Sequence, residues 1–210
     1  DRCLAVDEKG KEIDGDQIMA VCAEYLTAQG KLKSEGFVAT VMSNLGLHKF
    51  CEENHLKLLC AAVGDRNVLE LMQKESMVLG GEQSGHIIFL EHMTTGDGQL
   101  AALQFLSILG QSGKKASELA GQITHYPQLL QNVKVGSNEE KTAILNSAEL
   151  AAIVAREEER LAGHGRILLR ASGTEPLIRV MAEADTQDLA ESVVKTLVEA
   201  VENVQKILKK

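Results

Sequence analysis

Apolar residues in the first 110 positions alternate between short continuous runs and longer stripes with helical spacing. The short runs predict strands at 4–7, 37–41, 56–62, 77–79 and 87–90. The stripes, which recur every three or four residues, predict helices at 15–27, 44–54, 65–75 and 98–109. Strands that alternate with helices at this spacing indicate a mixed, mostly parallel α/β/α domain.

The pattern changes after Pro127, and we place a domain boundary near residues 124–130. A strand is predicted at 129–135, and a largely helical segment at 139–160 with a break near 146–147. Two further strands follow at 166–171 and 177–184, and a last helix begins at Asp185 or Thr186 with apolar residues along one face. This order predicts a smaller α+β domain with an antiparallel sheet and helices on one face.

Composition excludes several classes of partner. The chain has 210 residues, a formal net charge of -8, 3% aromatic residues and no Trp. Nucleic-acid-binding proteins usually carry a basic surface and aromatic side chains that stack on bases, so we expect no nucleic acid. The apolar run at 58–63 is too short for a membrane span. Four cysteines without paired or metal-ligand spacing predict buried, reduced thiols and a cytoplasmic protein.

The segment 165–180 carries the strongest chemical signal. Two apolar strands flank a Ser-Gly-Thr turn, with Arg170 before it and Arg179 after it. Backbone N–H groups and hydroxyls at Ser172, Gly173 and Thr174 can converge on one point, and each guanidinium group can form paired hydrogen bonds with a phosphate. The alternative is a plain hairpin with surface arginines. The combination favours a small anion, phosphate above all.

A glycine-rich segment at 80–86 is the second candidate. Clustered glycines allow close approach of a ligand, and Glu82, Ser84 and His86 would suit a polyhydroxylated sugar. By itself, such a segment is more often only a turn. Similarly, Asp65 beside Arg66 is typical of a helix cap with a solvated arginine, and the carboxylates at 14 and 16 are typical of helix capping rather than metal binding.

Taken together and in this order, these loops resemble those of the C-terminal half of the α-D-phosphohexomutase family, most closely its bacterial members. Residues 170–176 resemble the family's phosphate-binding loop, and residues 81–86 resemble its sugar-recognition loop. The opening Asp1-Arg2 resembles the end of its magnesium-binding loop, whose earlier aspartates are missing here. The stretches 63–66 and 94–98 also resemble this family, so the resemblance covers essentially the whole chain.

The resemblance implies a division of the chain into three parts. Residues 1–13 would be the remnant of a preceding domain, with the end of the metal-binding loop and a strand. Residues 14–126 would form the sugar-binding α/β domain and residues 127–210 the phosphate-binding α+β domain. Because the chain begins without Met inside a strand-like run, we expect it to be part of a longer protein that also contains N-terminal domains.

The resemblance also implies an activity for the parent protein. Members interconvert hexose 6- and 1-phosphates through a phosphoserine and a bisphosphate intermediate. Gln83 and the Thr-Thr-Gly-Asp-Gly run at 94–98 favour the branch that acts on glucosamine phosphates. Two alternatives are a mannose or glucose phosphate mutase and a stand-alone phosphosugar-binding module. The phosphoserine loop has no counterpart in these residues, so no catalytic residue is assigned and the chain alone is predicted to be inactive.

The same resemblance assigns roles to individual residues. Phosphate binding falls to Arg170, Ser172, Gly173, Thr174 and Arg179, and sugar binding to Glu82, Ser84 and His86. Asp65, Arg66 and Arg2 are possible substrate-side residues. Mg2+ serves the intact enzyme, but here only Asp1 remains of its site, so we expect this chain not to bind the ion.

Overall fold

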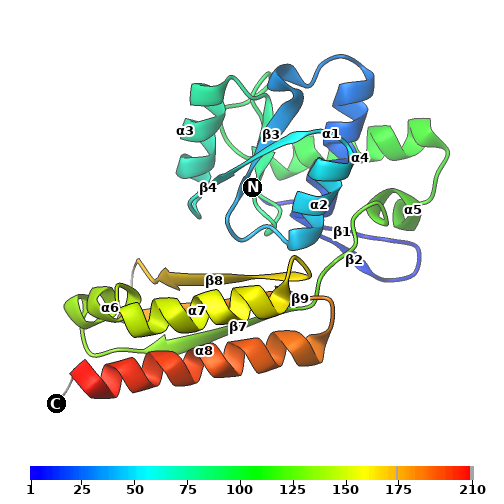
Figure 1. The fold of residues 1–210 in the computed structure, drawn as a ribbon. Coiled ribbons are helices and arrows are strands. Elements are labelled where there is room, and N and C mark those ends of the chain that lie inside the picture. Colours follow the sequence, from blue (N-terminus) through cyan, green and yellow to red (C-terminus); the bar gives the residue numbers. More distant parts are fainter. Residues whose placement is uncertain (174, 209–210) are drawn as a thin grey trace. The chain divides into compact units, whose positions relative to one another are not determined.

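The structure is a computed structural model that describes residues 1–173 and 175–208. The chain divides into two compact units, Asp1–His125 and Tyr126–Lys210. Each unit has its own sheet and its own hydrophobic core. Figure 1 shows the first unit in blue to green and the second in green to red.

The first unit is built on a four-stranded sheet with the order β4-β3-β5-β6. Its strands are β3 (Gly36–Thr40), β4 (Lys57–Ala61), β5 (Leu79–Gly81) and β6 (Ile87–Phe89). β3 is parallel to β4 and to β5, whereas β6 is antiparallel to β5. The expected mostly parallel sheet is confirmed. β6 runs the opposite way because only residues 82–86 join it to β5, which leaves no room for a crossover helix.

Helices cover both faces of this sheet. They are α1 (Gly15–Ala28), α2 (Leu45–Glu53), α3 (Asp65–Glu75) and α4 (Gly98–Ser112), close to the predicted positions. Phe37 and Ala39 of β3 belong to the core that contains α1, α2 and α4, whereas Val38 lies on the other face with Val68 and Met72 of α3. All five residues of β3 are therefore buried, as expected for a central strand covered on both sides.

The hydrophobic pattern did not predict some of the short elements. The strand β2 (Glu12–Ile13), the 3-10 turn η1 (Lys33–Glu35) and the helix α5 (Ala116–Ala120) are each too short to show a period. The strand β1 (Ala5–Val6) lies within the strand predicted at 4–7, and it pairs with β2 in an antiparallel hairpin. The expectation that Asp65 caps α3 is wrong, because Gly64 is the N-cap residue and Asp65 is the first helical residue. Gly64 has φ 126, a value that favours glycine.

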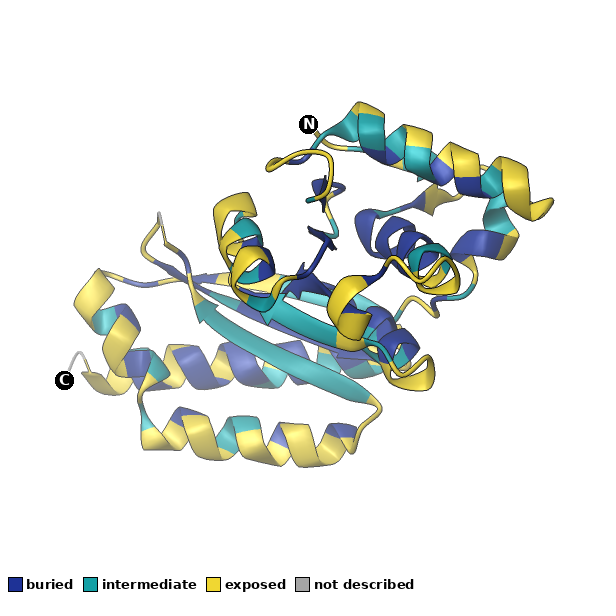
Figure 2. Cartoon of the chain, turned by 90° about the horizontal axis from the view of Figure 1, so that it is seen from above, coloured by how far each residue is buried: buried dark blue, intermediate teal, exposed yellow. Residues whose placement is uncertain are grey.

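The second unit is a three-stranded antiparallel sheet with the order β7-β9-β8. Its elements are β7 (Gln128–Lys134), α6 (Asn138–Leu145), α7 (Ala148–Leu161), β8 (Gly165–Ala171), β9 (Leu177–Ala184) and α8 (Gln187–Leu208). Ile178, Val180 and Ala182 share one face of β9 and pack in a core with the apolar side of α8. Figure 2 shows buried residues along one side of the helices and exposed residues along the other. The predicted α+β arrangement is confirmed.

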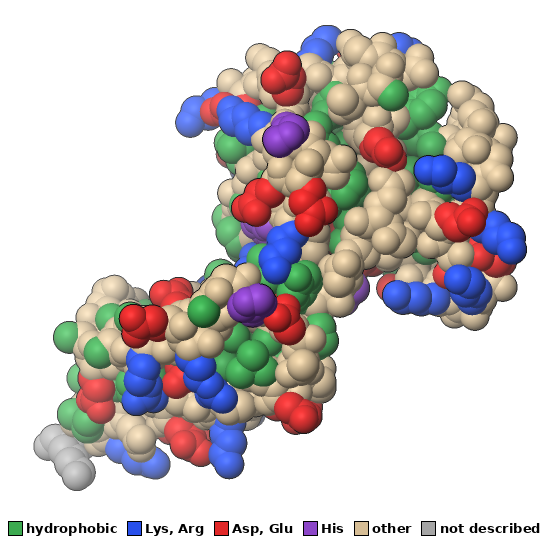
Figure 3. Space-filling model, turned by 45° about the vertical axis from the view of Figure 1, so that its right-hand side comes forward, with side chains coloured by type: hydrophobic (Ala, Val, Ile, Leu, Met, Phe, Trp, Pro, Cys, Tyr) green, Lys and Arg blue, Asp and Glu red, His purple; other side chains and the backbone are tan. Residues whose placement is uncertain are grey.

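The charged surface agrees with the composition, whereas the expectation of buried thiols holds for two of the four cysteines. Acidic and basic side chains are interspersed on the face shown in Figure 3, without a continuous basic region. Among the residues that the structure describes, no helix is both long and apolar enough to cross a membrane. None of the four cysteines, all of which the structure describes, forms a disulfide. Cys22 and Cys51 are buried, and burial raises the pKa of each thiol to about 12, whereas Cys3 and Cys60 are only partly buried.

Candidate functional site

The 81–86 loop of the first unit is held in one conformation by backbone hydrogen bonds. Within it, the Gly85 N–H donates to the Glu82 carbonyl at 2.9 Å. The loop also packs on the start of α1, where the Gly15 N–H donates to the Gln83 carbonyl at 2.9 Å. A Cβ atom on Gly15 would lie 2.1 Å from the Glu82 carbonyl oxygen, so only glycine permits this approach. Helix α1 therefore supports the loop directly.

Glu82 connects this loop to the 63–66 segment. Its Oε1 accepts a hydrogen bond from the Gly64 N–H at 3.1 Å, and within the described parts of the chain its other carboxylate oxygen has no hydrogen-bond partner. Ser84 is exposed at the tip of the loop. The second carboxylate oxygen of Glu82 can accept a hydrogen bond from a sugar hydroxyl, and the exposed Ser84 hydroxyl can donate or accept one.

His86 lies at the centre of a second set of contacts, with only 4% of its surface exposed. Its Nε2 accepts a hydrogen bond from the Gly96 N–H at 3.2 Å, so the neutral ring carries its proton on Nδ1. This Nδ1 is 3.5 Å from Oδ2 of Asp1. Arg2 forms a β-bridge with His86, and the Cys3 N–H donates to the Gly85 carbonyl at 2.9 Å. The N-terminal residues, the 81–86 loop and the 94–98 segment therefore meet at one place.

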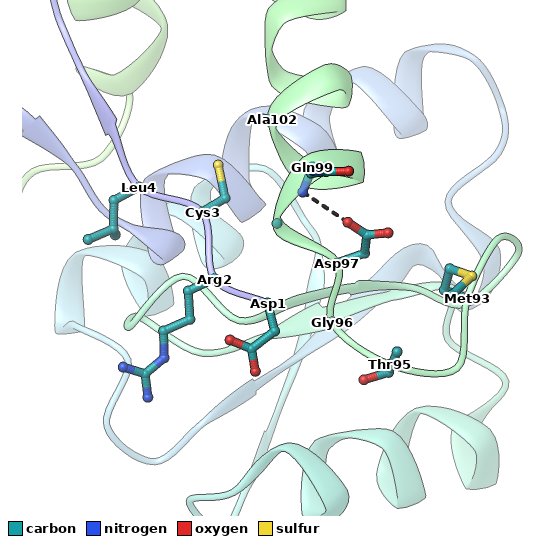
Figure 4. Close-up of a pocket in the computed structure, with 11 residues that line it drawn as sticks. Asp1, Arg2, Cys3, Leu4, Met93, Thr95, Gly96, Asp97, Gln99 and Ala102 are labelled. Atoms are coloured by element: carbon teal, nitrogen blue, oxygen red, sulfur yellow. Dashed lines mark hydrogen bonds between the residues drawn. The ribbon is translucent and has the colours of Figure 1, made fainter.

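Two cavities border these contacts. The smaller, of about 160 Å³, is lined by Asp65, Arg66, Leu69, His86, Ile88, Thr94 and Thr95. The larger, of about 620 Å³, is shown in Figure 4, where Asp1 and Arg2 of the N-terminal segment lie across from the start of α4. There Asp97 caps α4, and its Oδ1 accepts hydrogen bonds from the N–H groups of Gln99 and Leu100 at 2.9 and 3.1 Å.

The three possible substrate-side residues, Asp65, Arg66 and Arg2, differ in the hydrogen bonds and ion pairs that they already form. Asp65 is exposed, and its Oδ1 accepts a hydrogen bond from the Arg66 N–H at 2.8 Å. The Arg66 guanidinium pairs with Glu70 at 2.8 Å, and this hydrogen bond raises the pKa of Arg66. Arg2 is exposed beside the larger cavity. Arg66 would have to exchange its Glu70 partner before it could bind a substrate.

A complete metal site is not found in the part of the chain that the structure describes. No group of three or more His, Cys, Asp or Glu side chains converges there. The Asp1 carboxylate is 69% exposed and faces His86 rather than another carboxylate. A single carboxylate does not satisfy the octahedral coordination of Mg2+ by itself. These residues therefore do not fit the ion without further ligands.

The second unit brings its two predicted arginines together. Arg170 of β8 and Arg179 of β9 are directly opposite each other in the antiparallel register, so their side chains lie on the same face. Neither forms an ion pair with a described carboxylate, and the Nε atom of each is buried without a hydrogen-bond partner. Burial lowers the pKa of Arg170, and the charge of Arg179 lowers it further. Two such cations at one position have the charge and the hydrogen-bond donors that an anion requires.

Some of the polar groups in the turn between β8 and β9 form hydrogen bonds within the turn itself. Ser172 is 2% exposed, and its Oγ accepts a hydrogen bond from the Glu175 N–H at 3.3 Å. The Ser172 N–H itself donates to the Leu177 carbonyl at 3.0 Å. Gly173 is exposed, and no described residue accepts a hydrogen bond from its N–H. Thr174, the remaining predicted phosphate ligand, lies outside the described residues.

The structure also shows supporting residues that the sequence did not reveal. Gln83 Nε2 donates to Asp14 at 3.2 Å, so this side chain braces the loop from inside. Burial raises the pKa of Asp14, but hydrogen bonds from His125, the Gln17 N–H and Gln83 outweigh this effect and lower it. Lys141 lies under the 172–177 turn, to which it donates two hydrogen bonds. The hydrogen bond from the Gln17 N–H is the helix cap expected of Asp14, whereas the contacts of Gln83 and Lys141 join distant positions that no local pattern could have predicted.

Comparison with known proteins covers both units. A family model described as "Phosphoglucomutase/phosphomannomutase, alpha/beta/alpha domain III" matches residues 14–126. A second model, "Phosphoglucomutase/phosphomannomutase, C-terminal domain", matches residues 130–200. Among curated relatives, phosphoglucosamine mutase of Ligilactobacillus salivarius is 50% identical over 96% of this chain and 44% of its own length. That of Anoxybacillus flavithermus is 54% identical over 94% and 43%. The chain thus spans less than half the length of these relatives.

Solved structures agree on the fold. N-acetylphosphoglucosamine mutase of Aspergillus fumigatus, in complex with glucose 1,6-bisphosphate, superposes with a TM-score of 0.78 at 23% identity, over 96% of this chain and 46% of that one. A further structure of the A. fumigatus enzyme, in complex with GlcNAc-6P and magnesium, gives a TM-score of 0.77 at 21% identity, again over 96% and 46%. At this level of identity the similarity shows the fold alone.

Proposed function

Since this chain belongs to the phosphoglucomutase/phosphomannomutase family, we propose that it supplies the sugar- and phosphate-binding parts of a phosphoglucosamine mutase. This enzyme is an isomerase that interconverts glucosamine 6-phosphate and glucosamine 1-phosphate. Curated relatives that are 50% identical or more over nearly the whole chain carry this name. The observation that carries the proposal is the pair of unpaired arginines at 170 and 179.

The arginine pair would hold the phosphate group that does not react. A hexose phosphate in this site would be fixed at one end by two guanidinium groups and the Gly173 N–H. Phosphoryl transfer depends chiefly on positioning and on neutralising charge, and a clamp on the remote phosphate supplies the positioning. The proposed clamp has no carboxylate among its described partners, so it would be fully available to a dianion.

Glu82 and Ser84 would hold the sugar. The Glu82 carboxylate is anchored on one oxygen by the Gly64 N–H and leaves the other for a sugar hydroxyl. Hydrogen bonds of this kind can be made to hydroxyls that occupy similar places when the sugar is reversed. The ring would then turn between the two halves of the reaction while the same protein groups hold either phosphate.

The remaining chemistry requires residues beyond this chain. We propose that a phosphoserine loop of the parent protein donates the phosphoryl group, because these 210 residues contain no counterpart of it. The A. fumigatus neighbour was solved with magnesium, and we propose that Asp1 would be one ligand of such an ion, which would neutralise phosphate charge. The other ligands would have to come from elsewhere in the parent protein. By itself, the chain should therefore have no mutase activity.

A chimeric enzyme tests this proposal. The chain would replace the corresponding C-terminal segment of the Ligilactobacillus salivarius phosphoglucosamine mutase, and conversion of glucosamine, mannose and glucose 6-phosphates would be measured. We expect a preference for glucosamine 6-phosphate, lost when Arg170 and Arg179 are both changed to Ala. A preference for mannose or glucose phosphate would show that the chain comes from another branch. A folded chimera without mutase activity on any of the three would overturn the proposal.

A further inference from the structure

Lys141 is a buried lysine in the second unit. It lies on α6, 31 positions before Ser172, and is only 7% exposed. Lysine is almost never this buried unless its charge is compensated. Yet Lys141 forms no ion pair with any carboxylate of the described residues, and its hydrogen bonds go to neutral groups. A buried ammonium group without a counter-ion calls for a reason.

Its contacts point to the phosphate-binding turn. Nζ donates to the Ser172 carbonyl at 2.6 Å and to the Glu175 carbonyl at 3.3 Å. These two carbonyls lie on either side of Gly173, so one ammonium group pins both ends of the turn. With its carbonyl oxygens drawn toward Lys141, the turn directs fewer acceptors at the arginine pair. An anion is favoured where N–H donors outnumber acceptors.

We infer that Lys141 is a positioning residue of the phosphate site, which fixes the turn from beneath and adds a third positive charge to it. This inference rests on the proposed function of Arg170 and Arg179. The charge acts through the turn rather than by touching the ligand. In the bound state, the phosphate would then be the counter-ion of Lys141, with the turn lying between the two charges.

Three variants of the full chain test this role. Lys141→Met removes the charge and keeps the length of the side chain, whereas Lys141→Arg keeps the charge and the N–H donors. Lys195→Met removes an exposed lysine of α8 and serves as the control. Replacing a buried charge by an apolar side chain of similar volume is often neutral for stability, so the melting temperature of Lys141→Met should stay within about 4 °C of wild type.

The first measurement needs no ligand. The N–H groups of Ser172, Glu175 and Leu177 each donate a hydrogen bond within the turn. In wild type, local opening of the turn must also break the two Lys141 hydrogen bonds, which Lys141→Met lacks. Amide hydrogen exchange at these three positions should therefore be faster by about tenfold or more in Lys141→Met. Exchange in β9 beyond the turn should be unchanged. Equal exchange of the turn in wild type and Lys141→Met would overturn the inference, whatever the ligand does.

The second measurement is phosphorus NMR titration with inorganic phosphate and with glucosamine 6-phosphate. We expect about tenfold or greater weakening in Lys141→Met, partial recovery in Lys141→Arg, and wild-type affinity in Lys195→Met. Wild-type affinity in Lys141→Met would overturn the inference. If the wild-type chain binds neither ligand, the proposed function fails, and the exchange result alone decides whether Lys141 holds the turn.

Discussion

Replacing Arg170 by Met should make the chain more stable and its phosphate binding weaker. Arg170 and Arg179 are directly opposite on β8 and β9, where Cβ atoms are typically about 5 Å apart. For two charges about 7 Å apart, Coulomb's law gives about 0.6 kcal/mol of repulsion in water and about 2.4 kcal/mol at an effective dielectric constant of about 20. Screening favours the lower end, because Arg170 is only partly buried.

The buried, unbonded Nε atom of Arg170 adds to this gain, since an unsatisfied buried donor costs about 1–3 kcal/mol. Met retains most of the apolar stem, so little packing is lost. We expect a net gain of about 1 kcal/mol in the free energy of unfolding, measured by urea denaturation. Phosphate binding should fall by about 1.5–3 kcal/mol, or roughly 10- to 150-fold, the scale of a charge-assisted hydrogen bond.

Arg166→Met is the matched control on the same strand and the same face. Arg166 bonds the fully buried Glu183 carboxylate at 2.6 Å. Removing this partner leaves a buried charge uncompensated and should cost about 3–5 kcal/mol. The two variants are thus expected to change stability in opposite directions. Our account of Arg170 would be refuted if Arg170→Met lost stability as Arg166→Met does, or if it bound phosphosugar as wild type does.

Three further results are expected. Gly15→Ala should destabilise the chain by about 1–3 kcal/mol because its Cβ would collide with the 81–86 loop, whereas Gly110→Ala, with open space around it in α4, should stabilise it by about 0.5–1 kcal/mol; urea denaturation of both variants tests this, and equal effects would contradict it. Asp14→Asn should cost about 1 kcal/mol at pH 7. Because the pKa of Asp14 is lowered, this difference should vanish as the pH falls through the lowered pKa, below its ordinary value of 3.8; a difference that stays constant with pH in thermal melts would contradict it. Of the four thiols, Cys22 and Cys51 should react slowly with a disulfide reagent at pH 8 in the folded chain and quickly in urea, since burial raises each pKa to about 12; four equally fast thiols in the folded chain would argue against this burial.

The longer elements could be predicted because each carries enough residues to show a period. The α6–α7 break near Asn146 and the start of β9 at Leu177 both fall where polar and apolar spacing changes. Strand order could not be predicted, since a run such as 87–90 does not reveal its neighbours. Its antiparallel pairing with β5 follows from the short connection at 82–86, but the position of β5 beside β3 depends on packing between distant segments.

The contacts of the candidate site could be predicted where they join nearby residues and not where they join distant ones. Arg170 and Arg179 flank one turn, so their pairing could be inferred from a short segment. Lys141 contacts that turn from helix α6, and the residues next to it in the sequence do not indicate a role in the site. Gln83, which the sequence marked only as favouring the glucosamine branch, donates its side-chain hydrogen bond to Asp14. The sequence thus suggested which groups to consider for phosphosugar binding, while the supporting contacts depended on packing between distant segments.

A crystal structure of the chain with bound glucosamine 6-phosphate would test the central claim most directly. We predict phosphate oxygens within about 3 Å of both guanidinium groups, Arg170 and Arg179, and of the Gly173 N–H. A phosphate bound elsewhere in the chain, or one at this turn that neither arginine contacts, would contradict the account.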